Sequence, residues 1–262
     1  MKRIITFLAA LEAAGILSAQ VRFGIGARGL LGIGLGTTTD ISNSYTAGLS
    51  NDASPDYTSS VTPFNSLMSG GAVFGRISFD AVPGLYLQVE AGIFHTQVKY
   101  KSEGDFSYTL GSYSYDIEYE ASGNIYYSSI DIPLIAGYDI AIGESMFLSP
   151  YAGFNMSIPL GKLSWTQLEG ETKTSVSYDG NKKAAKEKIP GDSDSYGIKN
   201  GLIPGVVLGA GFGYKFDSHN TIIGDLRYLM DFTAVKCEAR HFDFDVLTRR
   251  GLTLGVSYVY FF

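Results

Sequence analysis

The sequence has little charge, almost no cysteine and no long apolar run after its first residues. Charged residues make up 18% of the 262 positions, and the net charge of −6 comes with no basic domain, which argues against nucleic acid as a partner. The single cysteine, Cys237, rules out an internal disulfide. Beyond residue 20, no apolar segment approaches the roughly 20 residues that a membrane-spanning helix needs. Neither disulfides nor a helical membrane bundle can hold this chain together.

Sequence motifs for chemistry are also missing. The three histidines are His95, His219 and His241, and no nucleophile motif, P-loop or metal-ligand spacing accompanies them. In "RHFDFD", His241, Asp243 and Asp245 alternate onto one face of a region that we expect to be external, which keeps an enzyme at the outer rim as a third hypothesis. We predict that the protein is not an enzyme and that it binds no metal and no cofactor.

The first twenty residues have the pattern of a secretory signal peptide. "MKRIITFLAALEAAGILSAQ" has a basic start, an apolar run and an exit of small residues, with cleavage expected after Ala19 or Gln20. A membrane anchor is the alternative, but the run is too short for one and carries Glu12. We therefore expect residues 1–20 to be a signal peptide, and residues 21–262 to be one exported domain.

The rest of the chain is rich in glycine and aromatics and alternates between apolar and polar residues. With 32 glycines and 13% aromatics, the composition is typical of an all-β protein, and period-two alternation predicts strands with two unlike faces. Eight such segments are expected at residues 21–36, 71–80, 85–94, 128–140, 146–160, 205–216, 221–232 and 251–262. Three prolines inside them, Pro133, Pro150 and Pro159, are expected at bulges or strand ends.

The connections between these segments alternate in length. Short turns are expected near 81–84, 141–145 and 217–220. Long loops are expected near 39–68, 103–124, 161–202 and 236–248. In an up-and-down meander, successive turns lie at opposite ends, so the short turns share one end and the long loops the other. The second long loop keeps alternating, and we expect it to form a hairpin that extends above a membrane.

The charges lie on the face that also carries most of the strand glycines, while the other face is nearly uncharged. The polar face is expected to carry Arg22, Arg28, Arg76, Glu90, Asp131, Asp139, Lys215, Asp225, Arg227 and Asp231. The interior of an eight-stranded barrel is narrow, and buried charges must be paired, so we expect ion pairs that fill the lumen. A soluble barrel would bury its apolar face instead. This distribution predicts an antiparallel transmembrane β-barrel with apolar residues outside.

The last strand adds a resemblance to a known family. Tyr258, Tyr260 and Phe262 end the chain on one alternating face, and "DIPLIAGY" at 131–138 resembles a strand motif of outer-membrane barrel domains. The chain is similar to the small eight-stranded barrels of the OmpX, OmpA and opacity-protein type. That resemblance implies location in the outer membrane of a diderm bacterium, with the three terminal aromatics recognised by the barrel-assembly machinery.

The expected function follows from this architecture. We expect an integral outer-membrane protein with a structural, adhesive or surface-interaction role, whose partners are outer-membrane lipid and host or surface proteins that meet its loops. A narrow pore or transporter for small solutes is the alternative. We rank it second because a filled lumen conducts poorly. Aromatics near strand ends are expected to form interfacial girdles, namely Tyr138, Phe147, Tyr214, Phe216, Tyr258 and Tyr260.

Overall fold

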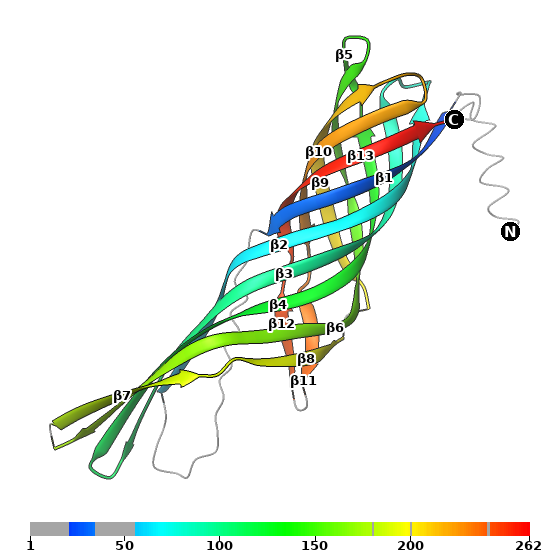
Figure 1. Ribbon diagram of the computed structural model, residues 1–262. Coiled ribbons are helices and arrows are strands. Elements are labelled where there is room, and N and C mark those ends of the chain that lie inside the picture. The colour runs from blue at the N-terminus through cyan, green and yellow to red at the C-terminus, as the bar shows by residue number, and fades with distance from the viewer. Residues whose placement is uncertain (1–20, 35–55, 180, 200, 240–241) are drawn as a thin grey trace, which may run out of the picture.

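The chain forms a closed antiparallel β-barrel that continues beyond its ring as a long twisted sheet (Figure 1). The computed structural model describes residues 21–34, 56–179, 181–199, 201–239 and 242–262. The expected signal peptide at 1–20 lies outside the described residues. In the part of the chain that is described, no helix is long and apolar enough to cross a membrane.

Eight strands make up the ring, as the sequence predicted. In ring order they are β1 (Val21–Gly34), β2 (Asp56–Phe79), β3 (Leu85–Leu110), β4 (Tyr113–Tyr138), β6 (Met146–Tyr178), β9 (Ile203–Lys215), β10 (Asn220–Asp231) and β13 (Arg250–Phe261). Each pairs antiparallel with both neighbours, and pairing of β1 with β13 closes the ring. The up-and-down order follows the sequence, so consecutive ring strands lie side by side.

The two ends of the barrel differ, and we call them the turn end and the extension end. The three short connections lie at the turn end, with the three-residue strand β5 (Ile140–Ile142) in the second of them and the C-terminus nearby (Figure 1). At the opposite end β3, β4 and β6 run on past the ring, and β6 alone has 33 residues. The predicted hairpin between β3 and β4 is confirmed, with Gly111 in its turn at φ 62°.

The prediction of long loops at the extension end is wrong for most of these residues, because they form strands. The additional strands are β7 (Asn181–Ile189), β8 (Asp192–Ile198), β11 (Val235–Ala239) and β12 (Phe242–Leu247). β2 begins at Asp56, inside the first expected loop, and residues 35–55 lie outside the described part. Water meets both faces of a sheet that projects beyond the ring, so these strands need no apolar face and give a weak period-two signal.

Strand β6 changes partner twice along its length. Met146–Ser157 pairs with β9 in the ring, Lys162–Gln167 pairs with β8, and Gly170–Tyr178 pairs with β7. Between the first two stretches Gly161 has φ 66°, a conformation that favours glycine. This irregularity lies where β6 leaves its ring partner β9 and begins to pair with β8.

The prolines disturb the ladders less than expected. Pro133 pairs with Asn155 and Pro150 with Ala210 without a register shift, so the prediction of bulges there is wrong. A proline removes one donor, and in these two places the neighbouring pairs keep the register. Near the third proline, Pro159, an irregularity does occur. It lies next to the predicted position, since β4 and β6 shift register between Tyr126 and Ser128, and Pro159 pairs with the adjacent Ser129.

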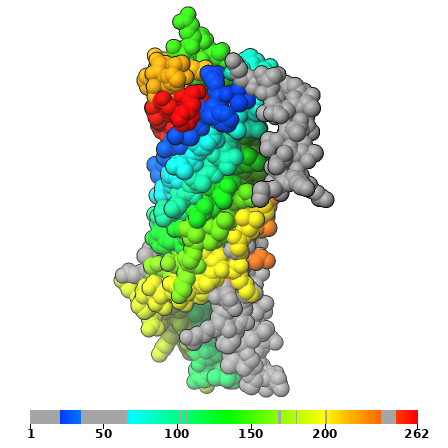
Figure 2. Space-filling view, turned by 90° about the vertical axis from the view of Figure 1, so that its right-hand side faces the viewer, coloured from blue at the N-terminus to red at the C-terminus, as the bar shows by residue number. Residues whose placement is uncertain are grey.

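The predicted orientation of the strands is confirmed, with the apolar face on the outside. One apolar residue from each ring strand, between 49% and 69% exposed, illustrates this: Ile25, Val73, Val89, Leu134, Phe154, Leu208, Leu226 and Leu254. Figure 2 shows successive strands, coloured from blue to green, lying against one another as a continuous wall. Exposing such a surface to water costs about 25 cal/mol per Å², whereas lipid removes that cost.

The interior is packed in layers. Near the turn end, Phe74, Phe147, Ile223 and Val259 form a buried apolar cluster. Phe147 is only 2% exposed, so its predicted place in an outer aromatic girdle is wrong. Its ring lies where a Cβ on Gly213 would have to be, which is why glycine is needed opposite it. The other expected girdle aromatics are between 39% and 61% exposed: Tyr138, Tyr214, Phe216, Tyr258 and Tyr260.

Candidate functional site

Glu90 is the centre of a charged network that spans the lumen. Both oxygens of its carboxylate accept hydrogen bonds from Arg227, from Nη1 and Nη2 at 2.9 Å each. Arg28 donates from Nη1 to Oε1 at 2.6 Å, and the Gln88 amide donates to the same oxygen at 2.7 Å. These residues come from β1, β3 and β10, so three strands that are far apart in sequence meet at one carboxylate.

A second carboxylate, Asp225, balances the two arginines of this central network. It lies 3.6 Å from Arg28 Nε and 3.8 Å from Arg227 Nε, and it accepts a short hydrogen bond from the Tyr151 hydroxyl. Arg28 Nε also donates to Ser257 Oγ at 2.8 Å. With two arginines and two carboxylates, the network is neutral, as groups removed from water require.

A further ion-paired group lies toward the extension end. Arg249 Nη2 lies 2.7 Å from Asp131 Oδ2, and its Nε lies 3.1 Å from Asp231 Oδ2. Ser129 Oγ donates to Asp131 at 2.8 Å, and Asn155 Nδ2 donates to the same carboxylate at 3.3 Å. One guanidinium thus bridges carboxylates on β4 and β10, and all three charged side chains are at most 3% exposed.

The third group lies toward the turn end. Arg76 Nη2 is 2.5 Å from Asp139 Oδ2, and its guanidinium lies over the Tyr86 ring at 3.5 Å from the centroid. Ser149 Oγ donates to Asp139 at 2.8 Å and lies 3.0 Å from the Tyr86 hydroxyl. This group ties β2, β3 and β6 to the residue that follows β4, at the turn end of the barrel.

The structure brings together eight of the ten residues predicted for the polar face. Arg22 and Lys215 do not join them and lie at the rim of the turn end. Arg22 Nε is 3.4 Å from Asp80 Oδ1 with half of its side chain exposed, and Lys215 Nζ lies 5.3 Å from the Phe147 ring centroid. Both keep the predicted alternation, but they lie beyond the closed part of the lumen.

Arg249 was missed by the sequence reasoning, although a signal was present. It is 2% exposed and continues the inward alternation of β13, in which Gly251, Thr253 and Ser257 are also buried. The residue lies just before the strand, between the expected loop at 236–248 and the expected strand at 251–262. Extending the period-two pattern by one step would have placed its charge inside.

Little free space remains beside the central network. The cavity among Arg28, Arg76, Tyr151 and Asp225 has a volume of about 10 Å³, which is room for roughly one water molecule. Beyond it, toward the extension end, the buried side chains of Val98, Tyr100, Ile125, Tyr127, Leu163, Ile203, Val235 and Cys237 form an apolar cluster. The interior of the barrel therefore holds buried apolar clusters as well as ion-paired groups.

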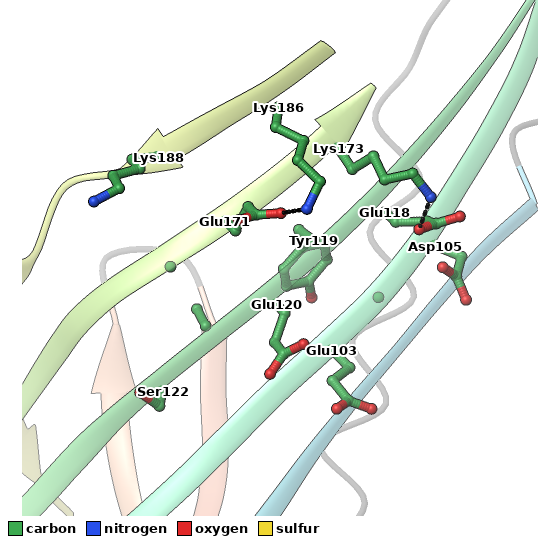
Figure 3. A pocket seen from close by; sticks show the side chains of 13 residues that line it. Glu103, Asp105, Glu118, Tyr119, Glu120, Ser122, Glu171, Lys173, Lys186 and Lys188 are labelled. Atoms are coloured by element: carbon green, nitrogen blue, oxygen red, sulfur yellow. Dashed lines mark hydrogen bonds and ion pairs between the residues drawn. The ribbon is translucent and has the colours of Figure 1, made fainter. Parts of the chain in front are cut away.

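The extension carries a charged cleft of about 990 Å³ on its outer side (Figure 3). Its carboxylates come mainly from β3 and β4, and its lysines come from β6 and β7. The charged residues that line it are Glu103, Asp105, Glu118, Glu120, Glu171, Lys173, Lys186 and Lys188. Lys173 is 2.9 Å from Glu118, and this bond lowers the pKa of that carboxyl. Lys186 lies 2.5 Å from Glu171, which raises the pKa of the lysine.

Tyrosines stiffen the tip of the extension. Tyr108 and Tyr115 stack across the β3–β4 hairpin at 4.6 Å between centroids, and Tyr113 stacks on Tyr178 of β6 at 4.5 Å. At the edge, β7 has lysines at four of its nine positions, and an edge strand with lysines resists indiscriminate strand pairing. The extension is therefore an ordered sheet that presents many polar side chains.

The comparisons with known proteins give similarity in structure alone. No family model matches the chain, and no curated protein matches it in sequence. Among solved structures it is similar to Neisserial surface protein A, at 12% identity and a TM-score of 0.33, over 92% of this chain and 97% of that one. A major outer membrane protein from Thermus thermophilus has 13% identity and a TM-score of 0.41, over 93% of this chain and 100% of that one. OprG from Pseudomonas aeruginosa has 11% identity and a TM-score of 0.38, over 92% and 96%.

The closed ring of eight strands, apolar outside and charged inside, decides the architecture. The fold is a closed eight-stranded antiparallel β-barrel with apolar side chains outside and charged side chains inside. In this barrel, the lumen groups and the cleft are the two candidate sites. The lumen groups join strands, whereas the cleft faces water.

Two of the histidines lie within the described residues. His95 Nδ1 is 2.8 Å from Ser128 Oγ on the outer face, and His219 Nδ1 is 2.8 Å from the Phe261 carbonyl oxygen in a turn. His241 lies outside the described residues, so the hypothesis of an enzyme at the rim is not addressed by the geometry. Within the described residues, no group of three metal-ligating side chains occurs.

Cys237 is buried in the apolar cluster at the extension end. It is 0% exposed, and burial raises the pKa of its thiol to about 11. The thiolate is the reactive form. We therefore expect a maleimide at pH 7.5 to leave the folded protein unlabelled and to label it fully after unfolding in urea, measured by the mass increase. Leu110→Cys in a Cys237→Ser background should label while folded, because position 110 is 67% exposed. Rapid labelling of the folded wild type would contradict the packing of this cluster.

Proposed function

We propose that this protein is an integral outer-membrane barrel that holds a rigid β-sheet at the cell surface, where it serves in adhesion or surface interaction. The observation that carries this proposal is the contrast between its two parts: the lumen has about 10 Å³ free at the central network, whereas β3, β4 and β6 continue far past the ring. A filled lumen makes a poor path for solutes, and an ordered extension makes a good platform for contacts.

The proposed orientation follows from the two ends. Membrane barrels have short turns on the periplasmic side and long segments outside, so the turn end faces the periplasm and the charged cleft faces the medium. Tyr258, Tyr260 and Phe262 then lie on the lipid side at the periplasmic end, where they are 39% to 67% exposed. That position is compatible with their proposed recognition by the barrel-assembly machinery.

Surface location can be tested on intact cells. We expect the outer-membrane fraction to contain a band with heat-modifiable mobility, and external protease to cut the extension while leaving a protected barrel fragment. Unchanged mobility on heating, or the absence of a protected fragment, would remove the membrane proposal.

The alternative of a narrow pore makes a different prediction. In planar bilayers we expect no steady single-channel openings, because three layers of ion pairs and two apolar clusters obstruct the lumen. Insertion would be verified in the same preparation by heat-modifiable mobility. Regular openings of one conductance from inserted protein would favour the pore over the platform.

A further inference from the structure

A groove crosses the outer face of β2, β3, β4 and β6 where the apolar surface gives way to polar side chains. It consists of two hollows of about 280 and 810 Å³, which share Ser69 and His95. The smaller hollow lies toward the extension end and the larger lies over the apolar wall. The two hollows therefore adjoin at Ser69 and His95, and we call them together the groove, with a polar part and a mainly apolar part whose lining includes the buried Arg28.

The polar hollow is lined by hydrogen-bonding side chains and one cation. No carboxylate lines it among the described residues, and none of the described carboxylates pairs with Lys162. His95 Nδ1 is engaged with Ser128 Oγ at 2.8 Å, and Gln97 Nε2 donates to the Tyr126 hydroxyl at 3.3 Å. The hollow is thus positively charged and rich in groups that can bind an anion.

The polar hollow is formed at the irregularity in β6. Ser128 pairs with Leu160 and Tyr126 pairs with Ser164, so three residues of β6 stand opposite the single residue between them on β4. Gly161, with φ 66°, permits this bulge, and Lys162 follows it on the exposed side. Bulges commonly re-aim a side chain, and here the re-aimed side chain is the cation of the groove.

The apolar hollow is a trough whose floor is made by small residues. Gly71 is exposed, and a Cβ there would meet nothing closer than 3.4 Å, while Ala91 lies on the same face of the next strand. Val73 and Ile93 rise beside them with 64% and 51% of their surface exposed. The trough has the shape and the chemistry to hold a hydrocarbon chain along the wall.

We propose that this groove binds one lipid of the surrounding bilayer whose phosphate headgroup carries a net negative charge. The phosphate lies against Lys162 and the ring of His95, and an acyl chain runs over Gly71 and Ala91. The two hollows match the two parts of an amphiphile, and their junction lies where the outer wall changes from apolar to polar, at the level of lipid headgroups. This inference rests on the proposed location of the barrel in a membrane.

The test compares a phosphate monoester lipid with a zwitterionic lipid that has the same chains. The folded protein in detergent is mixed with equal amounts of phosphatidic acid and phosphatidylcholine and washed, and the lipid retained is measured by native mass spectrometry. We expect about a tenfold preference for phosphatidic acid, the size of one charge-assisted hydrogen bond. Lys162→Gln should abolish the preference, and Gly71→Leu should reduce retention of both lipids by filling the trough.

Two variants outside the groove serve as matched controls. Lys188→Gln removes an exposed lysine of β7, and Gly75→Leu adds a side chain on the outer face of β2, where nothing lies within 4 Å. Both should retain lipid as the wild type does. Equal retention of the two lipids by the wild type, or an unchanged preference in Lys162→Gln, overturns the lipid site. Heat-modifiable mobility is recorded for every variant, so failure of the barrel itself is recognised separately.

Discussion

Glu90→Gln is expected to destabilise the barrel by about 3–5 kcal/mol, the cost of leaving buried charges without their partner. The Glu90 carboxylate accepts two hydrogen bonds from Arg227 and one from Arg28, and both arginine side chains are at most 4% exposed. Glutamine keeps the volume and removes the charge, so two guanidiniums would face each other with only Asp225 to balance them. The free energy of unfolding would be obtained from urea titration in lipid vesicles, followed by loss of heat-modifiable mobility.

Two further variants identify the cause of this loss. Glu118→Gln removes a carboxylate from an exposed pair with Lys173 and should leave stability nearly unchanged, since solvent screens such pairs. Combining Glu90→Gln with Arg227→Gln should restore part of the stability, because one unpaired cation is removed along with its lost partner. A loss below about 1 kcal/mol for Glu90→Gln would show that the lumen is hydrated well enough to screen its charges.

Leu254→Arg should destabilise the protein in vesicles by about 2–4 kcal/mol, the range for arginine near the bilayer midplane. Leu254 lies in the middle of β13 with 67% of its surface exposed, and on each side it pairs with another leucine, Leu31 and Leu226. An exposed leucine in water could take this substitution at little cost. The penalty arises only if the exterior of the barrel meets hydrocarbon.

Leu110→Arg provides the matched control. Leu110 is also 67% exposed, but it lies at the tip of the β3–β4 hairpin, which we place in the external medium. Arginine there should leave the urea midpoint in vesicles unchanged. Equal effects of the two substitutions would mean that both surfaces meet the same solvent, and the membrane orientation would then be wrong.

The positions of the eight ring strands could be predicted because each is apolar on one side and polar on the other. Residues such as Val73 and Arg76 have to face different surroundings, and this requirement leaves a period of two in the sequence. In the extension the same reasoning failed, because residues such as Lys173 and Thr174 both lie in a sheet with water nearby. Strand pairing there comes from neighbouring strands that continue together past the ring, which no single segment records.

The charged residues of the lumen could be assigned to one face, but their partners could not be assigned. Alternation places Glu90 inside, yet it does not say that Arg28 and Arg227 reach it while Arg76 pairs with Asp139. Those choices depend on ring closure and on the relative height of strands far apart in the chain. The same holds for Arg249, whose two carboxylate partners lie on β4 and β10.

The amino-acid sequence by itself determined the class of structure, the number of ring strands and the direction in which their apolar side chains point. It could do so because alternation is a local property: each ring strand needs one apolar face and one polar face. The tertiary structure alone decided which charges pair, that the supposed loops are strands, and that a bulge in β6 places Lys162 in the lining of the same hollow as His95. These features depend on distances between segments that are remote in sequence, and such distances are set only when the sheet closes.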